Sequence, residues 1–112
     1  MNDCLFCKIA AGEIPATKVR ETDRFLAFRD IDPQAPTHVL AIPRDHVASL
    51  NEASDAELIG SLVLFARDVA KEEGVADGGY RLVINTNAGA GQTVFHVHAH
   101  LLGGRPMRWP PG

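Results

Sequence analysis

The sequence predicts a single α+β domain in which one long helix packs on a mostly antiparallel sheet. Three observations favour this class: a strongly amphipathic segment after Ser54, short apolar segments separated by turn residues on both sides of it, and a length of 112 residues. With 46% hydrophobic and 22% charged residues, the composition is that of a soluble globular protein. No shift in composition divides the chain, so we expect one domain over residues 1–112.

The N-terminal part predicts a short helix and a meander. The helix is expected over Leu5–Ala11, because Gly12 favours a helix C-terminus and Pro15 forces extended backbone on the residue before it. Three short strands follow, with a turn at Asp23-Arg24: Lys18–Glu21, Phe25–Arg29 and His38–Ile42. Between the last two strands, the segment Asp30–Thr37 carries two prolines and two aspartates, which predicts a rigid loop suited to binding.

The long helix is predicted to begin at a capping box, in which the Ser54 hydroxyl and the Glu57 carboxylate satisfy orphan backbone donors. Apolar residues recur at helical spacing from there, and Gly74 is the expected stop. Three further elements complete the sheet: a strand at Tyr80–Asn85, a glycine-rich loop at Asn87–Thr93 and a strand at Phe95–Leu102.

Charge and hydropathy exclude two classes of partner. The formal net charge of −3 offers no general attraction for nucleic acid, so any nucleotide is expected to bind locally. No apolar run is long enough to cross a bilayer, and the N-terminus lacks the charged and apolar regions of a signal peptide. We therefore expect a cytoplasmic protein without membrane contact.

The candidate site centres on three histidines at alternate positions. On a strand, His96, His98 and His100 project to one face, while the apolar residues between them meet the helix. Adjacent members are then roughly 6.5–7 Å apart. A solvated strand face is one interpretation, and a hydrolytic metal centre is another, because histidines at i and i+2 often share a zinc ion. No Asp or Glu follows Gly78, however, so an acidic partner for such a centre is lacking nearby.

The preceding loop favours phosphorus chemistry instead. The glycines of residues 89–93 allow close approach of the backbone, and Gln92 and Thr93 add side-chain donors suited to phosphate oxygens. A neutral imidazole is a competent nucleophile toward phosphorus. His100 is expected to bond the transferring phosphate, and His38 or a neighbour to protonate the leaving group.

These residues resemble the histidine triad superfamily, whose signature appears as His96-Val97-His98-Ala99-His100-Leu101-Leu102. The segments 30–38 and 91–95 and the ending Trp109-Pro110-Pro111-Gly112 resemble its nucleotide-binding (Hint) branch. The match spans essentially the whole chain. It implies a five-stranded antiparallel sheet with one long and one short N-terminal helix, continued across a homodimer. It also implies hydrolysis of purine nucleoside phosphoramidates to an amine and a nucleoside monophosphate, with no cofactor required for chemistry.

The resemblance also implies roles for individual residues. His98 is the nucleophile, His100 and His38 complete the catalytic cluster, and Asp30 holds the ribose hydroxyls. The base lies among Phe6, Ile9, Phe28 and Ile31, for which plain core packing is the alternative. The phosphate region is formed by Asn85, Gly91, Gln92, Thr93 and Val94 together with His98 and His100. Thr93 departs from the more usual serine by one methyl group, which keeps the hydroxyl but tightens the leaving-group pocket. The end of the chain, 105–112, reaches toward the partner subunit and tunes the leaving group, or is a loosely ordered tail.

The pair Cys4 and Cys7 has zinc-ligand spacing but needs two further ligands. Some bacterial triad proteins and the related hexose-phosphate uridylyltransferases supply a following histidine and the first triad histidine, which correspond here to His46 and His96. This resemblance implies a structural zinc that takes no part in the chemistry. Two reduced, unligated thiols or a redox pair are the alternatives.

A phosphoramidase is the leading hypothesis. The first alternative is a regulatory dimer that binds nucleotide, and the second is hydrolysis of dinucleoside polyphosphates or nucleotidyl transfer. Val97 and His100 argue against transfer, because the uridylyltransferase branch has proline and glutamine at these positions.

Overall fold

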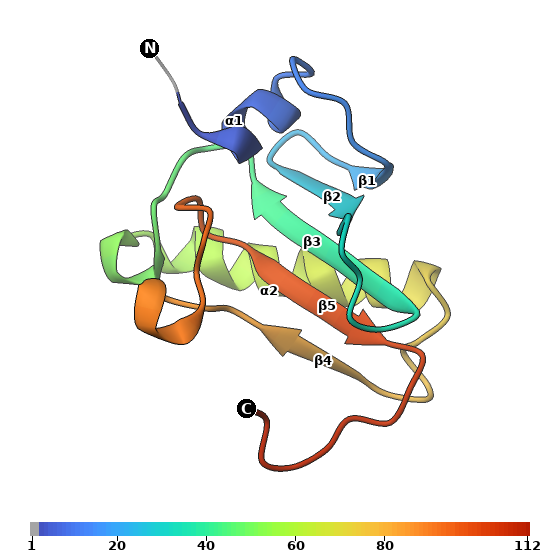
Figure 1. The fold of residues 1–112 in the computed structure, drawn as a ribbon. Coiled ribbons are helices and arrows are strands. Elements are labelled where there is room, and N and C mark those ends of the chain that lie inside the picture. Colours follow the sequence, from blue (N-terminus) through green and yellow to red (C-terminus); the bar gives the residue numbers. More distant parts are fainter. Residues whose placement is uncertain (1–2) are drawn as a thin grey trace.

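Five antiparallel strands form the sheet of this computed structural model, which describes residues 3–112 (Figure 1). The strand order is β1-β2-β3-β5-β4, with the long helix α2 behind the sheet and the short helix α1 near the first three strands. The elements are α1 Leu5–Ala10, β1 Lys18–Glu21, β2 Phe25–Arg29, β3 Thr37–Pro43, α2 Ala56–Glu72, β4 Tyr80–Val83 and β5 Ala99–Gly103, with 3-10 turns at Leu50–Glu52 and Ala88–Ala90. The α+β class and the five-stranded sheet are thus confirmed. Within residues 3–112, neither helix has the length and apolar character needed to cross a membrane.

The two faces of the sheet carry separate clusters. Val39 and Ala41 of β3 pack toward α2, where Phe65 stacks on Phe25 with ring centroids 5.4 Å apart. Leu40 and the other alternate residues pack toward α1 instead. This alternation follows from the two-residue period of a strand. His38 therefore shares its face with Leu40, and the candidate site lies on the α1 side.

The N-terminus of α2 differs from the predicted capping box. Asp55, not Ser54, is the N-cap, and its Oδ1 accepts the backbone N–H groups of Glu57 (3.0 Å) and Leu58 (3.2 Å). A carboxylate at this position also interacts favourably with the positive end of the helix dipole. The Glu57 carboxylate accepts hydrogen bonds from Arg24 and Ser61 instead of a backbone N–H of the capping box. These bonds lower the pKa of the Glu57 carboxyl to about 2.

The beginning of the last strand was also predicted wrongly. Regular pairing of β5 starts at Ala99, which lies opposite Ala41 of β3. The same register continued by two residues would put Pro43 opposite Val97, and proline has no N–H to donate to the ladder. Val97 donates its N–H to the carbonyl of Val47 at 2.6 Å instead. His96 and His98 therefore lie in the segment before the strand, and only His100 lies on it. The other strands match their predicted ranges within two residues, β4 ending at Val83.

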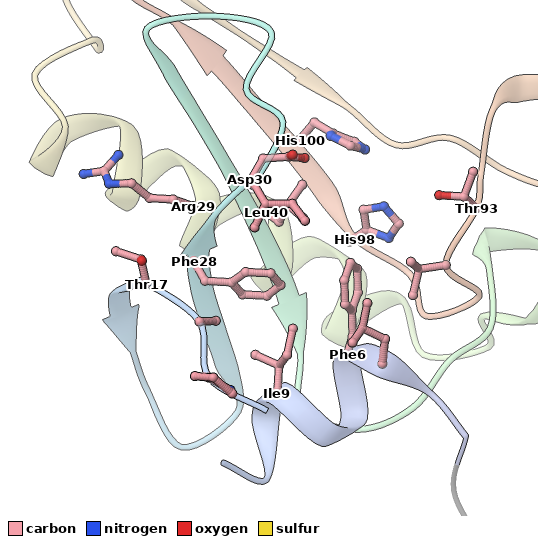
Figure 2. Close-up of a pocket in the computed structure, with 15 residues that line it drawn as sticks. Phe6, Ile9, Thr17, Phe28, Arg29, Asp30, Leu40, Thr93, His98 and His100 are labelled. Atoms are coloured by element: carbon pink, nitrogen blue, oxygen red, sulfur yellow. The ribbon is translucent and has the colours of Figure 1, made fainter. Parts of the chain in front are cut away.

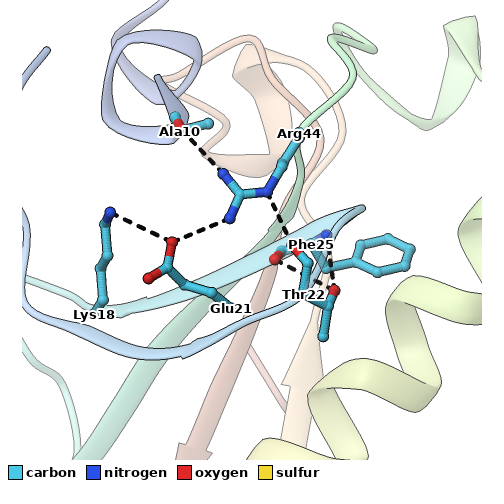
Figure 3. A network of polar contacts seen from close by, with 6 residues as sticks. All are labelled: Ala10, Lys18, Glu21, Thr22, Phe25 and Arg44. Atoms are coloured by element: carbon cyan, nitrogen blue, oxygen red, sulfur yellow. Dashed lines mark hydrogen bonds and ion pairs between the residues drawn. The ribbon is translucent and has the colours of Figure 1, made fainter. Parts of the chain in front are cut away.

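Helix α1 is fixed to the sheet by Arg44, which directly follows β3 (Figure 3). Its Nη1 donates to the Ala10 carbonyl at the end of α1, its Nε to the Thr22 carbonyl, both at 3.0 Å, and its Nη2 to Glu21 at 3.1 Å. Lys18 shares the Glu21 carboxylate but makes no such bond to α1. Arg44 thus sets the position of the helix that covers the candidate site.

Candidate active site

A pocket of about 650 Å³ lies between α1 and the sheet (Figure 2). Its lining includes nine of the predicted site residues: Phe6, Ile9, Phe28, Asp30, Ile31, Thr93, Val94, His98 and His100. It also includes Leu40, which the sequence analysis missed although its spacing of two from His38 places both on one strand face. The pocket therefore joins an apolar end to an end with histidines and a carboxylate.

The apolar end is an aromatic slot. Phe6 stands edge-on to Phe28, with ring centroids 5.4 Å apart at 77°, and edge-on to His98 at 5.0 Å and 84°. Phe6, Phe28 and Ile9 are buried, so part of their packing is ordinary core. Ile31 differs, since its side chain is fully exposed at the rim. This end offers flat apolar surface next to the His98 ring.

His98 has a defined tautomer. Its Nδ1 lies 2.7 Å from the carbonyl oxygen of His96, which can only accept, so Nδ1 carries the proton. The lone pair of a neutral His98 is therefore on Nε2. Burial lowers the pKa of His98 and outweighs the opposing effects of the His96 carbonyl and of Asp30. The ring is thus held neutral with one nitrogen available as a nucleophile.

His38 and His100 form a second pair with defined protons. The backbone N–H of Gln34 donates to His38 Nδ1 at 3.0 Å, so the proton of neutral His38 is on Nε2, which lies 2.9 Å from His100 Nδ1. His100 Nδ1 accepts, and the proton of His100 is on Nε2. Asp30 Oδ2 lies 3.4 Å from His38 Nε2. Burial, with the neighbouring histidines, lowers the pKa of His100 to about 4.

A cluster of four candidate metal ligands lies at the N-terminus of α1. His96 donates Nε2–H to the Pro43 carbonyl at 2.7 Å, which leaves its Nδ1 unprotonated. That nitrogen lies 3.3 Å from Cys4 Sγ, 3.4 Å from Cys7 Sγ and 3.3 Å from His46 Nδ1. Tetrahedral zinc, with bonds of about 2.0–2.3 Å to nitrogen and sulfur, places its ligand atoms about 3.3–3.8 Å apart. The donor set, the spacing and the backbone partner of His96 all fit zinc.

Asp30, His38 and His100 also bring their ligand atoms within 4.8 Å of one another. A metal-bound histidine normally donates its other ring N–H to an acceptor. His38 faces the N–H of Gln34 instead, so a metal on its Nε2 would leave the ring without a proton. These partners suit a shared proton better than a metal ion.

The glycine-rich loop is supported by Gln92 from within. Its Oε1 accepts the Asn87 N–H at 2.7 Å, and its Nε2 donates to the carbonyls of Ala48 (2.8 Å) and Val94 (3.1 Å). Gln92 was expected in the phosphate region, but its side chain is buried and is not among the residues that line the pocket. The side chain turns inward, where it satisfies three backbone groups: the N–H of Asn87 in the loop and the carbonyls of Ala48 and Val94 outside it.

The other residues expected in this region also differ in whether they line the pocket. Thr93 and Val94 do line the pocket, and the Thr93 hydroxyl faces the histidines (Figure 2). Among the described residues, Asn85 and Gly91 are not part of the pocket wall. Of the five residues expected in this region, only Thr93 and Val94 are therefore part of the pocket wall.

A family model of the HIT domain matches residues 11–107. The chain belongs to the histidine triad (HIT) family. A HIT family hydrolase from Legionella pneumophila Philadelphia 1 has a crystal structure with a TM-score of 0.95 and 57% identity, covering 98% of this chain and all of that one. Among curated relatives, the 14 kDa zinc-binding protein of Zea mays is 52% identical over 112 residues, covering 96% of this chain and 87% of its own length. Adenylylsulfatase HINT1 of Arabidopsis thaliana is 49% identical over 112 residues, covering 96% and 76%. The resemblance found in the sequence is therefore confirmed at the level of the family.

Proposed function

We propose that this HIT protein hydrolyses purine nucleoside phosphoramidates through a nucleotidyl intermediate on His98. The observation that carries the proposal is the 2.7 Å bond between His98 Nδ1 and the His96 carbonyl, which leaves Nε2 as an unprotonated nucleophile in the pocket. The hydrolase and adenylylsulfatase relatives support a reaction at a phosphorus centre.

In the first step, Nε2 of His98 forms a bond to phosphorus and the phosphorus–nitrogen bond breaks. The departing amine nitrogen takes up a proton from solvent, because His38 and His100 are both neutral and their hydrogen-bonded pair cannot give up a proton without forming an imidazolate. In the second step, a water molecule attacks the same phosphorus, the bond between phosphorus and Nε2 of His98 breaks, one proton of the water passes to solvent, and the nucleoside monophosphate leaves. His98 ends the cycle neutral, as it began.

In this proposal, each part of the substrate lies against a different part of the pocket. The purine lies in the slot of Phe6, Ile9 and Phe28, and the Asp30 carboxylate accepts from the ribose hydroxyls. The phosphate lies between the Thr93 hydroxyl and the Nε2–H of His100. Preorganised donors at the phosphate stabilise the charge that develops during transfer.

The test is release of AMP from an adenosine phosphoramidate, followed by chromatography. His98→Ala is expected to abolish turnover while retaining AMP binding by calorimetry, since only the nucleophile is removed. Adenylyl sulfate, assayed in parallel, identifies the preferred leaving group. Full turnover by His98→Ala would refute the mechanism. A wild-type protein that binds AMP but turns over neither compound would favour the regulatory-dimer hypothesis.

We also propose a structural zinc ion held by Cys4, Cys7, His46 and His96, as the zinc-binding relative and the ligand spacing support. When bound, zinc would tie α1 to the segment that carries His98, and it would take no part in the reaction. Burial raises the pKa of the Cys4 thiol, and a bound cation reverses that effect by favouring the thiolate.

Metal analysis of protein purified without chelator is expected to give about one zinc per subunit. The double variant Cys4→Ser, Cys7→Ser is expected to lose it, and its melting temperature should fall. Unchanged metal content in the double variant would rule out this ligand set.

We propose, finally, that the sheet continues across a homodimer through β4. This strand is at one edge of the sheet and pairs only with β5 within residues 3–112. On α2, Val63 and Leu64 are exposed apolar residues. Light scattering should give twice the subunit mass, and Leu64→Glu should shift the protein toward monomer. A monomeric wild-type protein at micromolar concentration would contradict the proposal.

A further inference from the structure

Arg105, two residues after the end of β5, holds the loop between β2 and β3. Its Nε and Nη2 both donate to the carbonyl oxygen of Gln34, at 3.1 and 3.0 Å, and its Nη1 donates to the carbonyl of Pro106 at 3.0 Å. A guanidinium that places two donors on one carbonyl fixes that peptide in position and in orientation. Lysine, with a single ammonium group on a flexible chain, cannot reproduce this geometry.

The adjacent residue makes an independent contact with the same loop. Gly104 has φ +87°, and a Cβ atom built there would lie 2.9 Å from Cβ of Pro36. Only glycine accommodates both this backbone conformation and this approach. The chain after β5 therefore touches the loop at two neighbouring positions, 104 and 105.

The loop residue that Arg105 holds is also the residue that orients His38. The Gln34 peptide receives Arg105 at its carbonyl and donates its own N–H to His38 Nδ1 at 3.0 Å. That donation requires the proton of His38 to be on Nε2, directed at His100 Nδ1 2.9 Å away. It thereby requires the proton of His100 to be on Nε2, the nitrogen that is left for a ligand.

We propose that Arg105 is a positioning residue that sets the proton arrangement of the His38–His100 pair through the Gln34 backbone. Arg105 is not among the residues that line the pocket, so it acts through the loop and not on a ligand. The effect on turnover rests on the proposed function, whereas the effect on the two rings does not. Without the guanidinium fork, the Gln34 N–H is no longer held on His38, and each ring can carry its proton on either nitrogen.

Ring-nitrogen NMR of protein containing 15N-labelled histidine measures this directly, because the two neutral tautomers have different shifts. In the wild type, His38 and His100 are expected in the Nε2–H form and His98 in the Nδ1–H form. In Arg105→Met, His38 and His100 should become mixtures while His98 stays unchanged, which makes His98 an internal reference. Arg105→Lys should give the same change to a smaller extent.

The matched control is Arg67→Met, which removes an exposed arginine whose guanidinium bonds only to Asp68 among the described residues. It should leave all ring signals unchanged. With an adenosine phosphoramidate, Arg105→Met should lower kcat by about 10- to 100-fold, as expected for a small misplacement of a catalytic group, while AMP affinity stays near the wild-type value.

A folded Arg105→Met protein that keeps both rings in the Nε2–H form would overturn the proposal, and so would an equal change at His98, which indicates general loosening. If the ring signals change as expected but the wild type hydrolyses no phosphoramidate, the positioning role stands and the proposed function fails.

Discussion

Lowering the pH from 7.5 to 5.5 should reduce the kcat/KM for a phosphoramidate by clearly less than two ordinary imidazoles would, although imidazoles carry the proposed reaction. The reaction requires His98 neutral, because a protonated Nε2 has no lone pair for phosphorus. It also requires His100 neutral, because protonation of its Nδ1 would place a proton against the Nε2–H of His38. Burial is the main cause that lowers the pKa of both rings below the ordinary 6.5.

The size of the effect follows from His100. An imidazole with the ordinary pKa of 6.5 is about 9% neutral at pH 5.5, whereas one with a pKa of about 4 is about 97% neutral. Two ordinary histidines would each reduce the rate about tenfold over this interval. The burial of His100 removes nearly all of its share of that loss, and the lowered pKa of His98 reduces the other share, so the acid limb of the profile should lie below pH 6.5.

The assay follows release of a fluorescent amine between pH 4.5 and 8, with kcat/KM taken at each value to report the unliganded enzyme. Melting temperatures at each pH serve as the control for folding. An unfolded histidine takes up a proton near pH 6.5, but folded His100 does so only near pH 4, so the free energy of unfolding should fall as the pH drops through this window. An acid limb with an apparent pKa of 6.5 or above, in protein that is still folded, would refute the reasoning.

Three substitutions test other parts of the structure. Gln92→Leu should lower the free energy of unfolding by about 2 kcal/mol in denaturant titrations, because it leaves the Asn87 N–H and two carbonyls without their partner. A loss below 0.5 kcal/mol would contradict this role. Arg44→Met should weaken AMP binding by about 3- to 10-fold in calorimetry with kcat retained, since α1 loses its anchor, whereas the control Lys18→Met should bind AMP normally. Equal effects of the two changes would refute the anchoring role. Asp55→Ala should cost about 1 kcal/mol in thermal unfolding, and Ser54→Ala should cost clearly less.

The fold class was predictable because the spacing of apolar residues along a helix or strand indicates which of its faces is buried. The strands at Lys18–Glu21 and Phe25–Arg29 and the body of α2 were found from such patterns. The errors arose where a local contact with a distant segment decides the outcome. β5 begins late because its register with β3, continued beyond Ala99, would bring Val97 opposite Pro43. The sequence of one strand does not determine its register with another.

The sequence predicted side chains of the candidate site that belong to a motif. It did not predict contacts that are made by backbone groups. His98, Thr93 and Phe6 were expected in the pocket from the resemblance, and they are there. Gln92 was expected to face phosphate but turns inward, because the backbone groups that it satisfies exist only in the folded loop. His38 is oriented by the backbone N–H of Gln34, a group that nearly every residue type has. No sequence pattern could therefore indicate this contact.

The division of labour among the histidines follows from these backbone partners. His96 and His98 each face a carbonyl oxygen, but through opposite nitrogens: His96 through Nε2 and His98 through Nδ1. Nδ1 of His96 is therefore left for the cysteine cluster, and Nε2 of His98 is left for phosphorus. The two proposed sites meet at one residue, because the ring of His96 belongs to the candidate metal cluster while its carbonyl oxygen accepts the hydrogen bond of His98. A shift of the His96 peptide would thus move the proposed metal ligand and the proposed nucleophile together.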